Sequence, residues 1–259
     1  MRMASQFFGL LLLLSCAGNP GTLVLAGGGK LPDSLFRQSL AACGTNSPIV
    51  LVFPQASSRE EAGSEVTRAW TAAGAQGVSV ADLSNPDTVA GQILEADILW
   101  FSGGSQLKLI EELDDAHLVH AIKSRHQQGA IVGGTSAGAA AMGKIVISGE
   151  PSPGPFTRGA MEAHEGLGLC PGLIIDQHFI QRNRNHRLLT AVMDNPRHVG
   201  VGISEGTIFR VRGRHGEVLG SGPVHIYDAR KAKIIGSGPL QSAERIQLSI
   251  LQAGDSYSW

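Results

Sequence analysis

The sequence predicts an α/β fold in which a mostly parallel β-sheet carries helices on both faces. Four short and almost continuously apolar runs each lead into a loop and then a helical pattern, at 22–26, 49–53, 97–101 and 130–134. Strands without polar alternation are typical of parallel sheets that are buried on both faces. Between the runs lie amphipathic segments, such as 60–73 and 116–127, which predict the covering helices.

After Gly200 the pattern changes from continuous to alternating. Apolar and polar residues alternate at 207–211, 224–227 and 246–250, with Gly-rich turns between them, which predicts extra antiparallel strands near the C-terminus. Segment 148–172 is long and punctuated by Gly and Pro, and loops of that length are often functional. We expect residues 18–259 to form a single catalytic domain.

The composition excludes several classes of protein. The 259 residues carry 21 basic and 22 acidic side chains, so the formal net charge is −1 and nucleic acid is not an expected partner. The 34 glycines, about twice the usual share, indicate tight loops and close backbone approaches. Fibrous and disulfide-framework proteins are excluded.

The N-terminal residues 1–17 read as a secretory signal peptide. One Arg precedes an apolar run that is too short to span a bilayer, and small residues follow it. Cleavage after Ala17 would release a secreted or periplasmic protein, whereas Leu-Leu-Ser-Cys also resembles a lipobox that would leave a lipid anchor on Cys16. A hydrophobic first strand is the remaining interpretation. A disulfide between Cys43 and Cys170 is permitted but not implied.

A candidate nucleophile follows the apolar run 130–134. Residues 134–138 read Gly-Thr-Ser-Ala-Gly between a predicted strand and a predicted helix, which is the context of a nucleophile elbow. Such a turn raises the Ser136 hydroxyl above the sheet and directs the backbone N–H of Ala137 at a developing oxyanion. A Gly-rich turn capped by serine, or a phosphate-binding loop, would have the same sequence.

The candidate base and its orienting acid also follow apolar runs. Of the nine histidines, His178 comes directly after the run 173–175, whereas His117, His120 and His126 share a helix that we expect to be solvated. Glu205 follows another strand-like run, 201–203. Sites of α/β proteins assemble at the carboxyl edge of the sheet, which favours both residues. Taken singly, each also fits an ordinary loop residue.

Two further segments offer binding groups. Arg182, Arg184 and Arg187 follow His178 closely and can bind carboxylates, although a solvated helix start would have the same pattern. Segment 101–106 is another strand-to-helix junction. It can supply backbone N–H groups at Gly103 and Gly104 and the side-chain amide of Gln106.

Neither a cofactor nor a metal ion is expected. Gly27, Gly28 and Gly29 lack the spacing of a dinucleotide-binding loop. His164, Cys170, Asp176 and His178 do not have a known zinc-ligand spacing.

Three motifs resemble those of the cyanophycinases: G-G-T-S-A-G-A, D-Q-H-F-x-x-R-x-R-x-x-R-L and G-V-G-I-x-E-G-T, in this order. These enzymes belong, with aspartyl dipeptidase, to a serine peptidase family whose fold is similar to class I glutamine amidotransferases (flavodoxin-like). The resemblance implies that Ser136 is the nucleophile, His178 the general base and Glu205 its orienting acid. It further implies a substrate site lined by Gln106, Asp176, Gln177, Arg182, Arg184 and Arg187. Ser204 departs from the pattern, because the family commonly has an acid there.

The implied activity is that of an exported serine exopeptidase. It would hydrolyse cyanophycin, multi-L-arginyl-poly-L-aspartate, to β-Asp-Arg dipeptides through an acyl-enzyme. Three alternatives stay open: an aspartyl or isoaspartyl dipeptidase of the same family, an inactive periplasmic binding protein, and an α/β-hydrolase esterase. The esterase would order its triad as Ser136, Asp194 and then His198 or His225. A homodimer is also compatible with the sequence.

Overall fold

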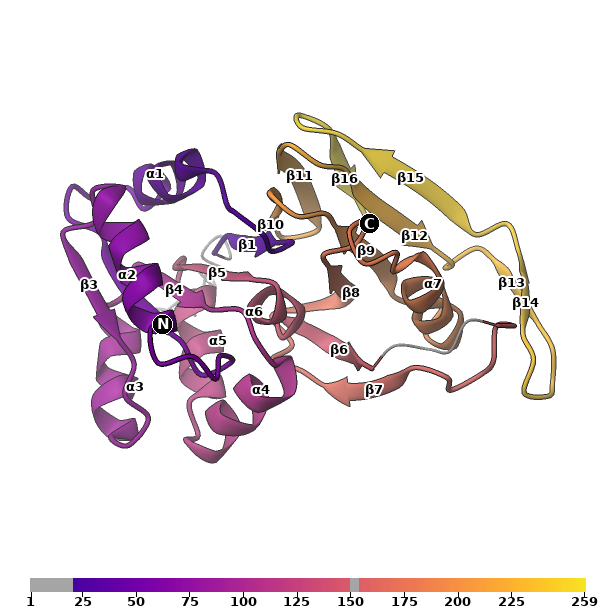
Figure 1. The fold of residues 1–259 in the computed structure, drawn as a ribbon, viewed down its shortest axis with the longest axis horizontal. Coiled ribbons are helices and arrows are strands. Elements are labelled where there is room, and N and C mark those ends of the chain that lie inside the picture. The colour runs from indigo at the N-terminus through magenta and orange to yellow at the C-terminus, as the bar shows by residue number, and fades with distance from the viewer. Residues whose placement is uncertain (1–20, 150–153) are drawn as a thin grey trace, which may run out of the picture.

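The computed structural model describes residues 21–149 and 154–259, and their strands form two large mixed sheets and one small one (Figure 1). The first sheet has the order β16 (Ser256–Ser258), β11 (His215–Gly220), β10 (Thr207–Arg212), β1 (Leu23–Ala26), β5 (Ile131–Thr135), β4 (Ile98–Phe101), β2 (Ile49–Phe53) and β3 (Gly77–Val80). The second has the order β15 (Gln247–Leu251), β12 (Val224–Asp228), β9 (Val199–Ile203), β8 (Cys170–Gln177), β6 (Gly143–Ser148) and β7 (Glu162–Glu165). The small sheet pairs β13 (Lys233–Ile235) with β14 (Ser242–Glu244).

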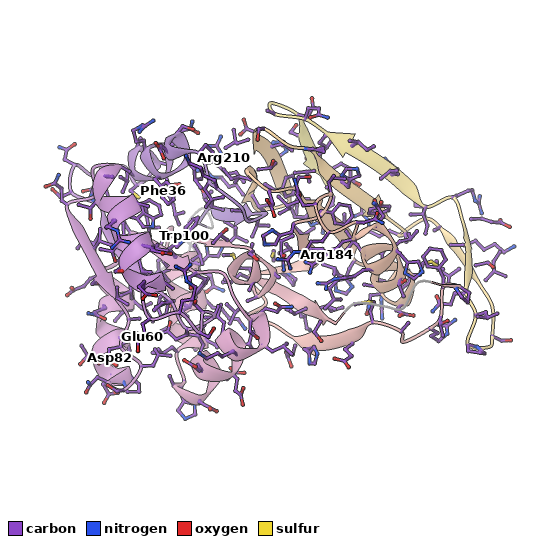
Figure 2. All side chains as sticks on the ribbon, viewed as in Figure 1. Phe36, Glu60, Asp82, Trp100, Arg184 and Arg210 are labelled. Atoms are coloured by element: carbon purple, nitrogen blue, oxygen red, sulfur yellow. The ribbon has the colours of Figure 1, made fainter. Side chains whose placement is uncertain are left out.

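The parallel part of the first sheet, from β1 to β3, is covered by helices on both faces. Successive strand side chains point to opposite faces, so Val24 and Leu25 belong to different apolar clusters. The Val24 face packs against α1 (Asp33–Ala42) and α2 (Ala62–Ala72). The Leu25 face packs against α3 (Pro86–Glu95), α4 (Gln106–Asp115) and α5 (Val119–Gln127). Phe36 of α1 packs directly against Trp100 of β4, with their ring centroids 6.0 Å apart (both are labelled in Figure 2).

The second sheet lies against the first with one face and carries α7 (Asn185–Asp194) on the other. In β8 the side chain of Ile174 packs with α7, whereas Leu173 and Ile175 join the same cluster as Phe101 of the first sheet. The short helix α6 (Ala137–Ala140) follows β5 directly and is buried at this junction. The carboxyl ends of β5, β8 and β9 are therefore held close together.

The predicted α/β class with helices and late antiparallel strands is confirmed. The four apolar runs become β1, β2, β4 and β5, and the alternating segments become β10, β12 and β15. Two details differ. The strands after residue 142 are divided between two sheets instead of extending one. Segment 148–172, predicted as a loop, contains β7 paired with β6, together with the start of β8.

The structure also bears on His126, on the two cysteines and on the N-terminal segment. His126 is buried, not solvated, and its Nδ1 lies 3.4 Å from the carbonyl oxygen of Ala130; burial lowers its pKa. Cys43 and Cys170 are separate free thiols. The predicted signal peptide and Cys16 lie outside the described residues. In the described ranges no helix is long and apolar enough to cross a membrane.

Candidate active site

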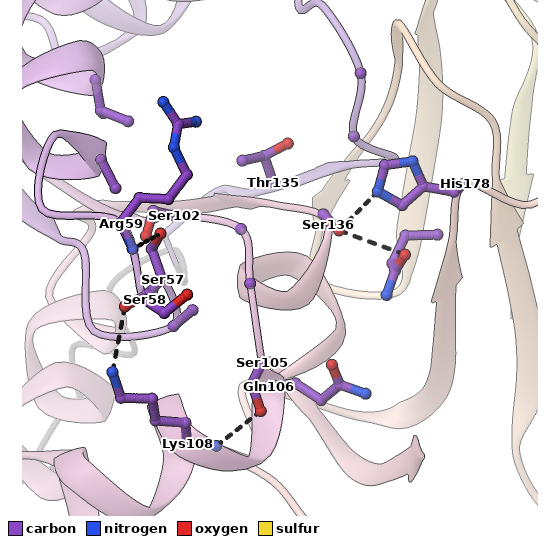
Figure 3. Close-up of a pocket in the computed structure, with 18 of the residues that line it drawn as sticks. Ser57, Ser58, Arg59, Ser102, Ser105, Gln106, Lys108, Thr135, Ser136 and His178 are labelled. Carbon is purple, nitrogen blue, oxygen red and sulfur yellow. Dashed lines mark hydrogen bonds between the residues drawn. The ribbon is translucent and has the colours of Figure 1, made fainter. Parts of the chain in front are cut away.

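Ser136, His178 and Glu205 form one hydrogen-bonded chain at the junction of the two sheets. Ser136 Oγ lies 2.8 Å from His178 Nε2, and His178 Nδ1 lies 2.6 Å from Glu205 Oε1 (Figure 3 shows the first contact). Because a carboxylate only accepts, Nδ1 carries the proton and Nε2 is free to accept the Ser136 proton. The candidate nucleophile Ser136 comes from the first sheet, whereas the candidate base His178 and its candidate acid Glu205 follow β8 and β9 of the second.

The turn that presents Ser136 is strained. Its φ of 53° and ψ of −117° lie outside the regions that L-residues prefer. The neighbours must be glycines: a Cβ on Gly134 would lie 2.6 Å from the backbone of Gly138, and one on Gly138 would lie 2.5 Å from the carbonyl oxygen of Phe101. The backbone N–H of Ser136 donates a hydrogen bond to the carbonyl oxygen of Ala26 at 2.9 Å, which holds the turn against β1. The turn therefore has the backbone geometry that a nucleophile elbow requires.

The backbone before α1 fixes the imidazole. Gly28 lies directly against the His178 ring, where a Cβ would approach the ring atoms to 2.4 Å, and Gly29 packs on the Glu205 side chain. The N–H of His178 donates to the carbonyl of Gly27 at 2.7 Å. The spacing of these glycines excluded a dinucleotide-binding loop but did not predict their contact with His178 and Glu205. Their position at the carboxyl end of β1 is the sequence feature that marks this contact.

The predicted oxyanion donors lie beside the nucleophile. A Cβ on Gly103 would lie 3.9 Å from Ser136 Oγ, so this backbone borders the hydroxyl. In the described part of the chain, the N–H groups of Gly103 and Ala137 have no hydrogen-bond acceptor. They are therefore available to a developing oxyanion. The N–H of Gly104 likewise has no acceptor among the described residues; this residue lines the cavity and packs against Ala56, in the loop after β2, with φ of 141°.

The Arg-rich segment after His178 contributes buried groups. Asp176 is fully buried and pairs with both Arg184, at 3.1 Å, and Arg187, at 3.0 Å. Arg184 also donates to the carbonyl and the side-chain oxygen of Gln177, each at 2.9 Å. Gln177 Oε1 lies 3.5 Å from Ser136 Oγ. Asp176 therefore holds the arginines in place from beneath the site and does not line the cavity.

A cavity of about 830 Å³ opens over Ser136, and most predicted binding residues line it. Arg182, Arg184 and Arg187 all do so, although only Arg187 lies within α7: Arg182 is in the preceding turn and Arg184 is the N-cap. Gln106 lines it from the first turn of α4 and donates to the carbonyl of Ile147 at 3.0 Å. Arg182 is exposed.

The opposite wall of the cavity was not predicted. Figure 3 shows Ser57, Ser58 and Arg59 across from His178, with Ser136 between them. Arg59, Glu65 and Lys108 bring charged groups to this wall from the loop after β2, from α2 and from α4. No sequence motif marks them, because they belong to an ordinary solvated helix start and a helix surface.

Other candidate groups are engaged elsewhere. Asp194 accepts hydrogen bonds from Gly159 and Gln241, so the esterase order of triad residues is not assembled. Burial raises the pKa of the Cys170 thiol to about 12, which makes it a poor nucleophile. His164 lies 2.8 Å from Ser148, away from His178 and Asp176. Ser204 is fully buried and its side chain is neutral, so this position supplies no second acid next to Glu205.

The comparisons with known proteins identify the family from the sequence and a similar fold from a solved structure. The model of peptidase family S51 matches residues 23–219. Cyanophycinase from Geminocystis herdmanii is 33% identical over 232 residues, which cover 83% of this chain and 84% of the relative. Peptidase E from Pasteurella multocida is 25% identical over 158 residues, 58% of this chain and 65% of the relative. The crystal structure of a peptidase from an acI-B1 Actinobacterium has a similar fold, with a TM-score of 0.70 at 21% identity, and the match covers 94% of this chain and 98% of that one.

Proposed function

This chain belongs to peptidase family S51, and on that basis we propose that it is a serine exopeptidase that degrades cyanophycin to β-Asp-Arg dipeptides. The observation that carries the proposal is the hydrogen-bonded chain from Ser136 through His178 to Glu205, with distances of 2.8 and 2.6 Å. This arrangement suits a peptidase because it supplies a nucleophile, a base and an orienting acid in one line.

The bond that is cleaved follows from the product. A dipeptide that keeps arginine on its β-carboxyl requires hydrolysis of the main-chain amide between two aspartates, not of the side-chain amide. Ser136 Oγ attacks the main-chain carbonyl carbon as His178 Nε2 takes the hydroxyl proton. The oxyanion receives hydrogen bonds from Gly103 and Ala137. His178 then returns the proton to the departing aspartate nitrogen, the C–N bond breaks, and an ester on Ser136 remains.

Water completes the cycle. His178 removes a proton from water, the hydroxide attacks the ester carbonyl, and Ser136 leaves with the proton that His178 holds. Glu205 keeps Nδ1 protonated throughout and stabilises the imidazolium in both steps. Arg182, Arg184 and Arg187 give the cavity a cationic side that suits the arginine α-carboxylates of the polymer.

The test is incubation of the purified protein, residues 18–259, with insoluble cyanophycin, followed by mass spectrometry of the soluble products. We expect β-Asp-Arg. Free arginine alone would indicate cleavage of the side-chain amide and contradict the proposal. Hydrolysis of α-aspartyl dipeptides without release from the polymer would favour the second candidate, a dipeptidase of the same family, which the likeness to peptidase E supports.

We propose, separately, that residues 1–17 direct export, since one Arg, a short apolar run and small residues there have the pattern of a secretory signal. Removing residues 1–17 is expected to retain the active protein in the cytoplasm. A Cys16→Ser variant distinguishes the two routes: a shift from the membrane to the soluble fraction indicates a lipoprotein, and an unchanged location indicates a freely secreted protein.

We also propose that the fold belongs with the class I glutamine amidotransferases. The parallel order of β1, β5, β4, β2 and β3, with the nucleophile directly after β5, supports this assignment. An experimental structure superposed on such an amidotransferase tests it, with these five strands and Ser136 expected to coincide with their counterparts.

A further inference from the structure

The cavity over Ser136 is strongly cationic but holds one acidic side chain. Arg59, Lys108, Arg182, Arg184 and Arg187 line it together with Glu65, which is the only carboxylate among its described lining residues. Asp176 lies outside the lining and is paired with Arg184 and Arg187. An anion entering the cavity therefore has several partners, whereas a cation has one.

One carboxylate oxygen of Glu65 is available to a ligand. Its Oε1 accepts a hydrogen bond from Arg59 Nη2 at 2.5 Å. Its Oε2 has no hydrogen-bond partner among the residues that the structure describes. The side chain is 43% exposed, so a ligand can approach it from the cavity. A carboxylate can accept from two guanidinium groups at once, because its two oxygens offer about four lone-pair sites.

The helix that carries Glu65 also offers an apolar surface. Ala62, Glu65 and Val66 of α2 all line the cavity, and their i, i+3, i+4 spacing places them on one face. This face matches an arginine side chain, which has an apolar stem of three methylenes and a planar cationic end. The stem can pack on Ala62 and Val66 while the guanidinium reaches Glu65.

We propose that this face of α2 is the arginine side-chain subsite and that Glu65 is its specificity-determining residue. The inference rests on the proposed function, because an arginine-bearing polymer supplies the ligand. It divides the recognition of each unit between two walls. The cationic segment that follows His178 meets carboxylates, and Glu65 on the opposite wall meets the guanidinium.

The test uses two synthetic peptides of three aspartates each. One carries arginine on every β-carboxyl and the other carries citrulline, whose neutral urea has nearly the shape of the guanidinium. We expect the protein to prefer the arginine peptide by about tenfold in kcat/KM, as for one charged hydrogen-bonded contact in a partly exposed site. In Glu65→Gln the preference is expected to fall to about one, mainly through KM. An unchanged preference in this variant would overturn the proposal.

Two variants separate recognition from indirect effects. Glu60→Gln removes another exposed carboxylate next to the same helix but outside the cavity, so it controls for net charge (Figure 2 labels Glu60). We expect it to keep the preference. Arg59→Gln tests whether Glu65 acts only by holding Arg59. The preference is expected to survive in Arg59→Gln, and its loss there to the same extent as in Glu65→Gln would contradict the assignment.

Binding measurements keep the two proposals distinguishable. In a Ser136→Ala background, which cannot form the acyl-enzyme, calorimetry compares the affinities of the two peptides with and without Glu65→Gln. If the arginine peptide binds about tenfold more tightly than the citrulline peptide and Glu65→Gln abolishes this difference in affinity, the subsite is supported. This holds even if the unaltered protein does not hydrolyse the arginine peptide. Hydrolysis of that peptide with equal affinities for arginine and citrulline leaves the proposed function standing and removes Glu65 from it.

Discussion

At the scale of single residues, the backbone of Ser136 links catalysis to stability. Its φ of 53° with ψ of −117° is a conformation that costs an L-residue of the order of 1–3 kcal/mol and that glycine adopts freely. Ser136→Ala and Ser136→Gly are both expected to lower hydrolysis by about 10⁴-fold or more, because neither has a hydroxyl.

The two variants are expected to differ in stability. Ser136→Gly relieves the strain but makes the unfolded chain more flexible, which leaves a net gain of about 1 kcal/mol over Ser136→Ala. Thermal denaturation is the measurement, with the glycine variant melting about 2–4 °C higher. Equal melting temperatures would show that the elbow is not strained.

A second residue-scale prediction concerns the glycine behind the imidazole. Gly28→Ala places a methyl group 2.4 Å from the His178 ring, so the ring must move away from Ser136. Displacement of a catalytic group by about 1 Å costs about 10²-fold in rate. We expect a loss of that size in kcat with little change in KM.

Gly74→Ala is the matched control for Gly28→Ala. Gly74 also has a positive φ, 106°, but a Cβ there meets nothing within 4 Å. Both variants therefore carry the strain of a left-handed alanine, and only one crowds His178. A similar loss of activity in both would mean that general destabilisation, not the contact with the imidazole, is responsible.

At the scale of elements, the segment from His178 to the first turn of α7 has two kinds of arginine. Arg182 is exposed, whereas Arg184 is buried against Asp176 (Figure 2 labels Arg184). Arg184→Ala is expected to lower the free energy of unfolding by about 3–5 kcal/mol, because it leaves the buried Asp176 carboxylate with fewer partners. It is expected to slow small esters as well as peptides, since Arg184 also holds Gln177 beside Ser136.

Arg182→Ala is the complementary variant in the same segment. Its unfolding free energy is expected to change by less than about 0.5 kcal/mol, while kcat/KM for the arginine peptide falls by about tenfold or more. Urea denaturation and peptide kinetics on the two variants check both expectations. An Arg182→Ala variant with normal peptide kinetics would leave anion recognition to the buried arginines.

The sequence predicts local elements better than their partners. The run 49–53 is the strand β2, as predicted, because an apolar run of five residues rich in Val and Ile is too short for a buried helix. β3 was missed, since Gly77–Val80 is short and only partly buried. Nothing in the run 173–175 shows that β8 belongs to a second sheet, because pairing depends on residues far away in the chain. Ser136 and His178 could be predicted as site residues because each directly follows a predicted strand. Glu65 could not, because it lies on an ordinary helix surface and only the folded chain brings it to the cavity.

At the scale of the whole molecule, Asp228 ties the two sheets together. It lies at the end of β12 and accepts a hydrogen bond from the hydroxyl of Tyr257 in β16, at 3.0 Å, across the junction. Side-chain hydrogen bonds from Arg230, with smaller contributions from the Arg230 backbone and Tyr257, lower the pKa of Asp228 to about 2 from 3.8. A carboxyl group whose pKa is lower in the folded than in the unfolded state stabilises the fold at pH values above its unfolded pKa. This stabilisation is lost as the pH falls and the carboxylate is protonated.

The contribution of Asp228 is therefore present above about pH 4 and is lost between about pH 4 and 2. We expect it to amount to about 1–2 kcal/mol after screening by solvent. Asp228→Asn is expected to lower stability at neutral pH and to flatten its pH dependence in this range, as measured by urea denaturation at several pH values. Asp115→Asn, at an exposed site, is the control and is expected to change neither.

The antiparallel pairing of β1 with β10 also constrains how the molecule is made. Leu23 lies opposite Val211, so one edge of the first strand stays open until most of the chain has left the ribosome. Glu205 likewise reaches His178 only after β9 has been synthesised. Contacts between distant parts of a chain form slowly, because a long loop must close first. A chain that ends before β9 is therefore expected to have no peptidase activity and to expose the unpaired backbone edge of β1 to chaperones and proteases.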